Sequence, residues 1–253
     1  MPAAVDLPYR FRHGARRDVL LLCDHASNAI PSEFDALGLD AAARQRHLAW
    51  DPGAAGVTSA MAEALDCPAF FGAVSRLVAD LNRAPDAPDL IVAENDGTQV
   101  PGNRRVDEME RQRRVVAYHR PYHHAIGRHL DLALREGERP LVVAIHSFTP
   151  VYHGQPRPWQ VGALWKQRFA WLDALLAALR EVASDVGDNQ PYDGTVLQGY
   201  TLETHAAARG LPHILFELRQ DLVAEPAQQA QWARQLLHAL ARAGVLRLDF
   251  GVA

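Results

Sequence analysis

The sequence predicts an α/β protein in which helices cover a largely parallel or mixed sheet. Short, almost wholly apolar runs alternate along the chain with longer segments whose apolar residues recur every three or four positions. The first pattern is typical of buried strands and the second of amphipathic helices. Because the two kinds of segment alternate, we expect a layered α/β domain.

Three apolar runs predict strands, at residues 18–23, 141–145 and 213–216. Each run breaks off into polar residues that include a histidine or a carboxylate. In α/β sheets, ligands bind beyond the carboxyl ends of the strands. We therefore expect His25, His146 and Glu217, which follow the three runs, to lie at a binding site.

Four segments have the periodicity of helices, at residues 54–65, 106–136, 166–183 and 226–243. The second contains Pro121, and a break is expected near it because proline lacks a backbone donor and clashes with the preceding turn. Two long turn-rich stretches, residues 82–102 and 185–199, separate predicted elements. Loops of that length in a compact domain are often functional.

Length and composition indicate one globular domain spanning residues 1–253. Of the 253 residues, 48% are hydrophobic and 22% are charged, which is enough to bury a sizeable core. The 26 Lys and Arg residues are outnumbered by 30 Asp and Glu residues, for a formal net charge of −4. No overall positive field exists to attract nucleic acid or an anionic membrane surface, so neither is expected as a partner.

Targeting signals and disulfides are not evident. Residues 1–17 lack the apolar core of a signal peptide, and no stretch approaches the roughly 18 apolar residues that span a bilayer. Only two cysteines are present, which suits a reducing compartment. We therefore expect a cytoplasmic protein.

The sequence lacks the motifs of serine hydrolases, P-loop proteins, dinucleotide-binding folds and zincin proteases. These classes of protein therefore lose their usual support. Catalytic zinc takes three His, Asp or Glu ligands and keeps a position open for water. His25, His146 and a nearby carboxylate meet that requirement. A histidine just past a strand is, alternatively, an ordinary hydrogen-bonded loop residue.

Two arginines, Arg76 and Arg83, flank an apolar stretch that also holds Asp80. One interpretation is a surface segment stabilised by an ion pair. The other is a substrate site, because the planar guanidinium of Arg83 and the amide of Asn82 suit bidentate capture of a carboxylate.

Glu217 follows an apolar run. An ionised carboxylate is costly there unless it is paired or used. The sequence leaves two interpretations open, a salt bridge to Arg219 or another arginine, and a catalytic function.

Seven short segments resemble the N-formylglutamate amidohydrolase family, in order and across nearly the whole chain. They are CDHASNAIP, WDPGA, SRLVADLNR, YHRPYHHAI, AIHSFTP, NQPYDG with GYTLETHA, and FELRQDL. The resemblance implies a zinc-carboxypeptidase or aspartoacylase type of fold, a three-layer α/β sandwich with a central mixed, largely parallel sheet. It also implies Zn²⁺-dependent hydrolysis of N-formyl-L-glutamate to formate and glutamate, as in histidine degradation.

The resemblance implies that His25 and His146 are zinc ligands, but it leaves the third ligand open. The wider fold group uses a His-x-x-Glu pair, whereas this chain has Asn28 at the glutamate position. A neutral amide is a poorer zinc ligand than a carboxylate. We expect Asp51 to replace it. Asp24 is the next candidate, and it would otherwise orient an imidazole.

The resemblance also implies roles in catalysis and substrate binding. Arg76 corresponds to an arginine that polarises the scissile carbonyl, Asn82 and Arg83 to a pair that binds a carboxylate, and Glu217 to the general base.

Further substrate-binding candidates are Asn28, Tyr122 in the YHRPYHH helix, and Thr201 at a helix start. The resulting hypothesis is a zinc-dependent amidase for a small N-acyl amino acid, as a monomer or a small homo-oligomer. Two alternatives stay open: a metalloamidase for another N-acyl amino acid, and a metal-free carboxylate-binding protein on the same scaffold.

Overall fold

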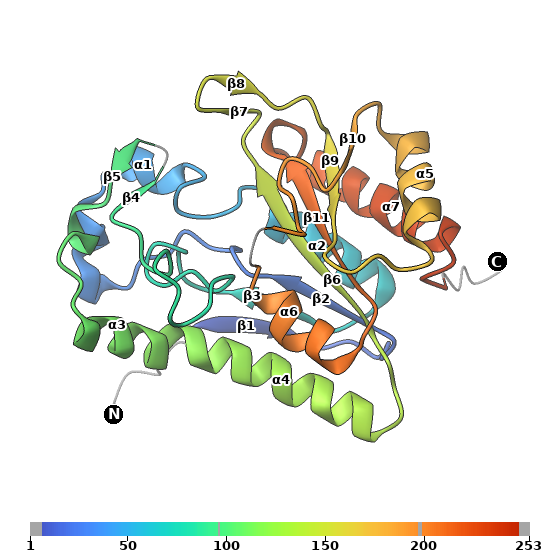
Figure 1. Cartoon of the computed structure of the whole chain (residues 1–253), viewed down its shortest axis with the longest axis horizontal. Coiled ribbons are helices and arrows are strands. Elements are labelled where there is room, and N and C mark those ends of the chain that lie inside the picture. The colour runs from blue at the N-terminus through green and yellow to red at the C-terminus, as the bar shows by residue number, and fades with distance from the viewer. Residues whose placement is uncertain (1–6, 96, 197–198, 248–253) are drawn as a thin grey trace.

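A computed structural model describes residues 7–95, 97–196 and 199–247. A seven-stranded sheet with the order β1-β3-β2-β6-β11-β9-β10 forms its centre (Figure 1). The strands are β1 (Tyr9–Arg12), β2 (Val19–Cys23), β3 (Ala69–Gly72), β6 (Leu141–Phe148), β9 (Val161–Leu164), β10 (Val186–Asp188) and β11 (His213–Arg219). The pairs β1–β3 and β9–β11 are antiparallel and the other neighbours are parallel, so the predicted mixed, largely parallel sheet is confirmed.

The helices and small hairpins lie around this sheet. The helices are α1 (Ala41–Gln45), α2 (Ala54–Leu65), α3 (Glu108–Arg114), α4 (Arg120–Arg135), α5 (Leu172–Val182), α6 (Thr201–His205) and α7 (Pro226–Arg242). The hairpins are β4 (Glu94–Asn95) with β5 (Thr98–Gln99), and β7 (Val151–Tyr152) with β8 (Gln155–Pro156). Short 3-10 turns occur at Pro101–Asn103, Ala207–Arg209 and Gln220–Leu222, and an irregular turn at Ser32–Gly38.

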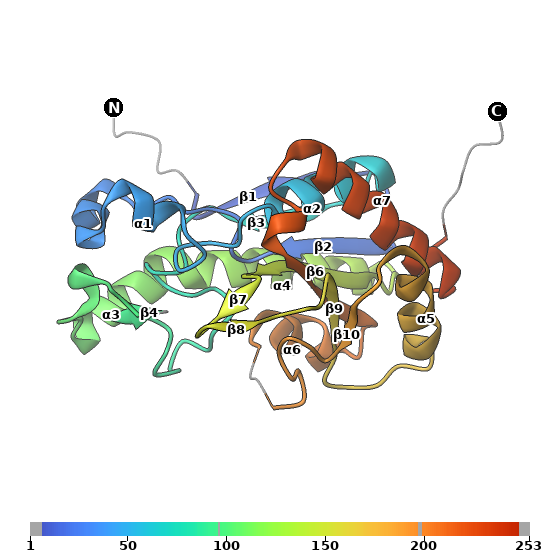
Figure 2. The ribbon, with the colours of Figure 1, turned by 90° about the horizontal axis from the view of Figure 1, so that it is seen from above.

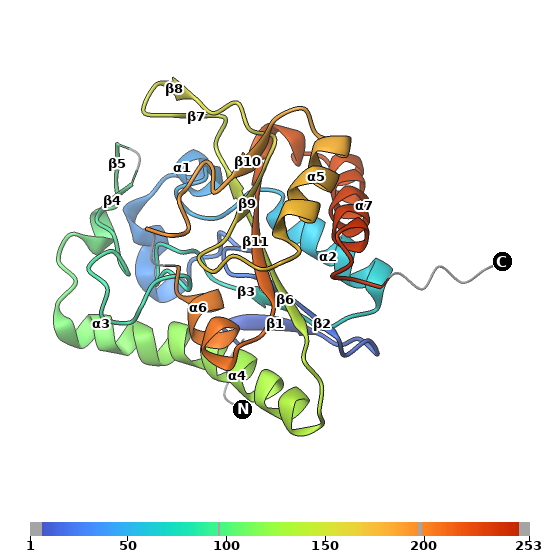
Figure 3. The ribbon, with the colours of Figure 1, turned by 45° about the vertical axis from the view of Figure 1, so that its right-hand side comes forward.

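Side chains of the central strands alternate between two apolar layers, as expected for strands buried on both faces. Leu21 of β2 and Val143 of β6 pack with α2, α5 and α7, whereas Leu20 and Val142 pack with α4 and the end of α6. Figure 2 shows α2 and α7 on one side of β2 and α6 on the other, and Figure 3 shows the same separation. The three-layer sandwich is therefore confirmed.

Predicted helices and observed helices agree closely at α2 and α7. The expected break near Pro121 is a π-helical turn (Val115–His119), after which Pro121 occupies the first turn of α4, where its missing donor costs nothing. The helix predicted from residue 166 begins only at Leu172. Trp165, just before this segment, has its backbone N–H and carbonyl hydrogen-bonded to the side chain of Asn189.

A separate small core, which includes Leu37, Leu48, Leu77 and Val100, fixes the long connections that follow β2 and β3. In Figure 1, α1 and the β4–β5 hairpin lie near each other beyond the carboxyl end of β2. Among the described helices, none is both long and apolar enough to cross a membrane.

Candidate active site

A cavity of about 920 Å³ lies at the carboxyl ends of β2 and β6 and is lined by His25, Asp51, Arg76, His146 and Glu217. These residues come from separate parts of the chain and meet because the parallel strands end at the same edge of the sheet. Along β6 and β11, the lining side chains belong to the face opposite the α2–α5–α7 layer. The sheet therefore brings the predicted strand-end residues together.

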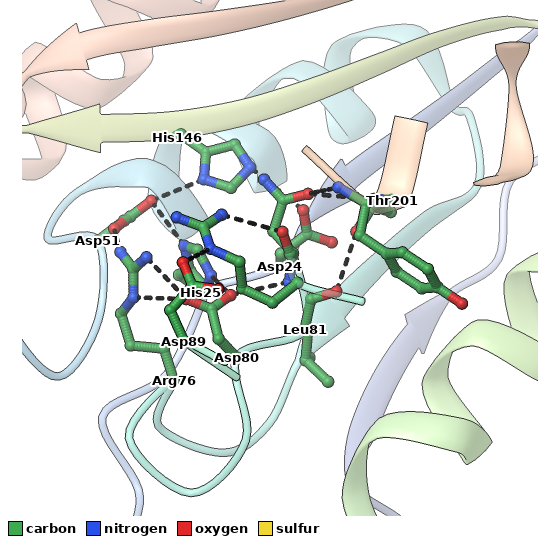
Figure 4. A network of polar contacts seen from close by, with 12 residues as sticks. Asp24, His25, Asp51, Arg76, Asp80, Leu81, Asp89, His146 and Thr201 are labelled. Atoms are coloured by element: carbon green, nitrogen blue, oxygen red, sulfur yellow. Dashed lines mark hydrogen bonds and ion pairs between the residues drawn. The ribbon is translucent and has the colours of Figure 1, made fainter. Parts of the chain in front are cut away.

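His25, Asp51 and His146 converge at the base of this cavity. Oδ2 of Asp51 lies 3.3 Å from Nδ1 of His25 and 2.9 Å from Nδ1 of His146 (Figure 4). One ligand atom of each residue lies within 4.8 Å of the others, and all three side chains are buried. Two imidazoles and one carboxylate make up a donor set that a catalytic zinc ion accepts.

The remaining nitrogen of each imidazole faces another buried carboxylate. Nε2 of His25 is 2.7 Å from Oδ1 of Asp80, and Nε2 of His146 is 3.2 Å from Oδ2 of Asp24. Carboxylates that accept from the outer nitrogen fix a metal-binding imidazole in the tautomer that presents its other nitrogen to the ion. A divalent cation between the two Nδ1 atoms and Asp51 therefore fits the side chains present.

The pKa values of Asp51 and His146 are set by burial and by the charged side chains next to them. Burial opposes ionisation of Asp51, yet the adjacent His25 and His146 hold the pKa of its carboxyl well below the ordinary value. Burial likewise opposes protonation of His146, but Asp24 and Asp51 on its two ring nitrogens raise its pKa well above the ordinary value. The site thus stabilises positive charge at the point where its nitrogens and oxygens meet.

Glu217 stands beside this cluster on β11 and lines the cavity. Its Oε2 atom is buried and has no hydrogen-bond partner among the described residues. Burial raises its pKa to about 7. Arg219 is paired with Asp221 at 2.8 Å, so the alternative of a Glu217–Arg219 salt bridge is wrong. A buried carboxyl that titrates near neutral pH is suited to proton transfer.

Arg76 lies at the cavity wall and is held by two carboxylates. Its Nε and Nη2 donate to Oδ2 of Asp80 at 3.0 and 2.7 Å, and its Nη1 lies 3.5 Å from Oδ1 of Asp51. The ion pair that was one interpretation of this segment is therefore present. It is part of the buried cluster rather than a surface feature.

Asn82 and Arg83 also line the cavity, with part of their hydrogen-bonding capacity used. Nε of Arg83 donates to Oδ2 of Asp89 at 2.6 Å, and Oδ1 of Asn82 accepts the backbone N–H groups of Tyr200 and Thr201 at 2.8 and 3.1 Å. Asn82 thereby fixes the start of α6.

Three predicted substrate-binding residues are not among the residues that line the cavity. Asn28 donates to the backbone carbonyl of Arg44. Tyr122 is fully buried and donates to Asp24 at 2.8 Å, and the hydroxyl of Thr201 donates to the carbonyl of Leu81 at 3.2 Å. In this structure a side-chain polar atom of each of the three residues bonds to another group of the protein and not to the cavity.

The sequence interpretation missed several polar residues of the site. Asp80 was seen only as a possible partner of arginine, and its contact with His25 spans 55 positions. Arg157 and Tyr192 line the cavity and are hydrogen-bonded to each other. The sequence signals for Tyr192 were its place in the NQPYDG segment and in the long turn-rich stretch at residues 185–199.

The matched family model is that of N-formylglutamate amidohydrolase, over residues 17–224. No curated protein matches the chain. A gene product from Agrobacterium tumefaciens of known crystal structure is 35% identical, with a TM-score of 0.91 over 95% of this chain and 96% of that chain.

The crystal structure of N-formylglutamate amidohydrolase from Ralstonia eutropha JMP134 is 19% identical, with a TM-score of 0.64 over 94% of this chain and 97% of that chain. This likeness supports the fold. The family model covers most of the chain and includes every residue of the His25–Asp51–His146–Glu217 cluster. The chain belongs to the N-formylglutamate amidohydrolase family, and this membership supports an amide hydrolase activity.

Proposed function

We propose that the protein is a zinc-dependent hydrolase that cleaves N-formyl-L-glutamate, or a similar N-acyl amino acid, to the free acid and the free amino acid. The observation that carries the proposal is the meeting of His25, Asp51 and His146 beside a buried carboxyl, Glu217, whose Oε2 atom has no partner among the described residues. Membership of the amidohydrolase family supports the reaction class.

The imidazoles of His25 and His146 and the carboxylate of Asp51 would hold the ion. A bound Zn²⁺ would make a water molecule more acidic and polarise a carbonyl oxygen. Asp80 and Asp24 keep the two imidazoles oriented, because each accepts from an Nε2 atom. Arg76 holds Asp51 and Asp80 in place and brings a positive charge to the wall where an acyl oxygen becomes negative.

Glu217 moves the proton in this scheme. Its carboxylate accepts a proton from the water molecule whose oxygen bonds to the acyl carbon. It then donates that proton to the amide nitrogen as the carbon–nitrogen bond breaks. With a formyl substrate, the water oxygen ends in formate and the proton on the amine of the amino acid. A pKa of about 7 allows Glu217 to act in both directions near neutral pH.

Substrate binding falls to the cationic side chains of the cavity. Arg83 retains guanidinium N–H groups beyond the one bound to Asp89, and it is placed by its neighbour Asn82. An arginine fork binds a carboxylate through two parallel hydrogen bonds. Local charge, rather than the net charge of −4, would attract an acidic substrate.

The size of the cavity favours one alternative, a metalloamidase for a larger N-acyl amino acid. At about 920 Å³ the cavity is near the upper end of the roughly 300–1,000 Å³ that hold drug-sized ligands, whereas N-formylglutamate has only about a dozen non-hydrogen atoms. Leu164, Trp165 and Leu215 line part of the wall and would accept an apolar group.

Metal analysis combined with a substrate series tests the proposal. Purified protein is assayed for bound metal, stripped with a chelator and reloaded with Zn²⁺. Hydrolysis of N-formyl-L-glutamate is then compared with that of N-acetyl-L-glutamate and of N-formyl derivatives of apolar amino acids. We expect about one Zn²⁺ per chain, activity that is lost on stripping and restored on reloading, and preference for one member of the series.

Better hydrolysis of a bulkier derivative would select the alternative substrate. Carboxylate binding without hydrolysis, in protein that takes up no zinc, would instead identify a metal-free binding protein.

A further inference from the structure

Arg157 is a nearly buried guanidinium in the cavity wall that has no carboxylate partner among the described residues. Its exposed fraction is 9%, and within the described part of the chain the one hydrogen bond of its side chain runs from Nη1 to the hydroxyl of Tyr192 at 3.1 Å. By contrast, Arg76, Arg83 and Lys166 of the same cavity each have an acidic partner. A buried cation is costly unless an anion accompanies it.

Aromatic rings surround this guanidinium and fix its position. Its central carbon lies 4.4 Å from the ring centre of Tyr152, 5.0 Å from that of Tyr192 and 5.8 Å from that of Phe148. Ring faces stabilise a cation without using its N–H groups. The remaining donors of Arg157 are therefore available to a ligand in the cavity.

Tyr192 adds a second donor. Its oxygen accepts from Arg157, so its own O–H proton is free to be donated. Burial and the nearby charge of Glu217 raise the pKa of Tyr192 to about 12, so the hydroxyl keeps its proton at neutral pH. Tyr192 and Arg157 line the same cavity as Glu217, the residue that moves the proton in the proposed reaction.

We propose that Arg157 and Tyr192 together bind a carboxylate group of the substrate and thereby select acidic amino acids. This inference rests on the proposed function and goes beyond it, because it names a specificity-determining pair that is not among the substrate-binding residues predicted from the sequence. The guanidinium supplies the charge and the phenol a directed hydrogen bond. With Arg83 on another part of the wall, the cavity has two cationic groups for the two carboxylates of a glutamate-like product.

Calorimetric titration of the reaction product and its amides tests the pair. L-Glutamate, L-glutamine and L-isoglutamine are titrated into the wild type and three variants: Arg157→Gln, Tyr192→Phe and the control Arg242→Gln, whose arginine is exposed on α7. Glutamine lacks the side-chain carboxylate and isoglutamine lacks the α-carboxylate, so the amides show which carboxylate is bound.

Arg157→Gln is expected to weaken glutamate binding by about 10–100-fold, as for loss of a charge-assisted hydrogen bond. The amide that keeps the carboxylate bound by Arg157 should lose affinity by the same factor as glutamate. The amide that lacks this carboxylate should bind to Arg157→Gln as it does to the wild type. Tyr192→Phe, which removes a single oxygen atom, is expected to weaken binding of the same ligands by about 2–10-fold. The control Arg242→Gln is expected to bind all three ligands as the wild type does.

Three results would overturn the inference: no binding of glutamate to the wild type, unchanged binding by Arg157→Gln, or an equal loss with all three ligands. Failure of the proposed function is a separate result, since it appears as absence of N-formyl-L-glutamate hydrolysis and does not enter the binding comparison. A folding defect in Arg157→Gln is revealed by comparison with Tyr192→Phe.

Discussion

Glu217 of β11 and His146 of β6 are direct register partners in neighbouring parallel strands. Their side chains belong to the same face of the sheet and both line the cavity. The strand pairing therefore fixes the distance between a buried carboxyl and an imidazole of the proposed metal site without any contribution from a flexible loop.

Replacing Glu217 with glutamine is expected to lower kcat by about 10²–10⁴-fold, the usual effect of losing a general acid–base group. Zinc content should be unchanged, because Glu217 is outside the His25–Asp51–His146 donor set. Steady-state kinetics and elemental analysis measure the two quantities, with Glu63→Gln, an exposed substitution on α2, as the control. A variant that kept its kcat would remove Glu217 from the proton-transfer role.

The raised pKa of Glu217 predicts how stability depends on pH in the metal-free protein. A carboxyl whose pKa is about 7 when folded and near the ordinary value of 4.5 when unfolded binds more protons in the folded state between these values. Its contribution is fully present below about pH 4.5 and is lost as pH rises through 7. The full change is on the order of 3 kcal/mol.

Urea unfolding of wild type and Glu217→Gln between pH 5 and 8, with a chelator present, measures this effect. The free energy of unfolding of the wild type should fall relative to that of the variant as pH rises towards 7. Above pH 7 the difference between the two should become constant. A difference that stays constant over this range would show that Glu217 ionises as in the unfolded chain.

Asp51 and Asp80 are predicted to affect metal affinity to different degrees. Asp51→Asn removes a proposed ligand, so zinc should be lost almost completely under conditions where the wild type is saturated. Asp80→Asn removes no proposed ligand, but it removes the charge that faces Nε2 of His25 and that pairs with Arg76. Loss of a carboxylate that orients a ligand typically costs about 10–100-fold in metal affinity. Competition with a zinc-binding dye gives both values, with the exposed Asp173→Asn as the control. Equal affinities in wild type and Asp51→Asn would exclude Asp51 as a ligand.

Arg83→Ala is expected to act mainly on substrate binding. Its guanidinium lines the cavity but makes no contact with the His25–Asp51–His146 cluster among the described interactions. Loss of a carboxylate-binding arginine should raise KM for N-formyl-L-glutamate about 10-fold or more and change kcat little. A fall in kcat at constant KM would instead assign Arg83 to the transition state.

The buried centre of the fold could be predicted from the sequence because its pattern is local. β2, β6 and β11 each contain a continuous apolar run, and α2 has the bounds that its periodicity predicts. Strands such as β1 and β9 were missed. Each has only four residues, and β1, at the edge of the sheet, has no buried side chain, so neither gives a long periodic signal.

The site was predictable to the extent that its residues follow predicted strands or belong to the family segments. His25, His146 and Glu217 meet the first condition, and Asp51 was proposed because Asn28 replaces the expected carboxylate. The contacts of Asp80 and Arg157 were not predictable, because each joins residues that only the folded chain brings together: Asp80 with His25, and Arg157 with Tyr192, 35 positions apart.

A crystal structure of the zinc-loaded protein, with anomalous diffraction data collected on both sides of the zinc absorption edge, tests the proposed metal site. We expect one strong zinc peak, bonded to Nδ1 of His25, Nδ1 of His146 and a carboxylate oxygen of Asp51. A zinc peak bound by other residues, or no peak at this position in protein that hydrolyses N-formyl-L-glutamate, would contradict it.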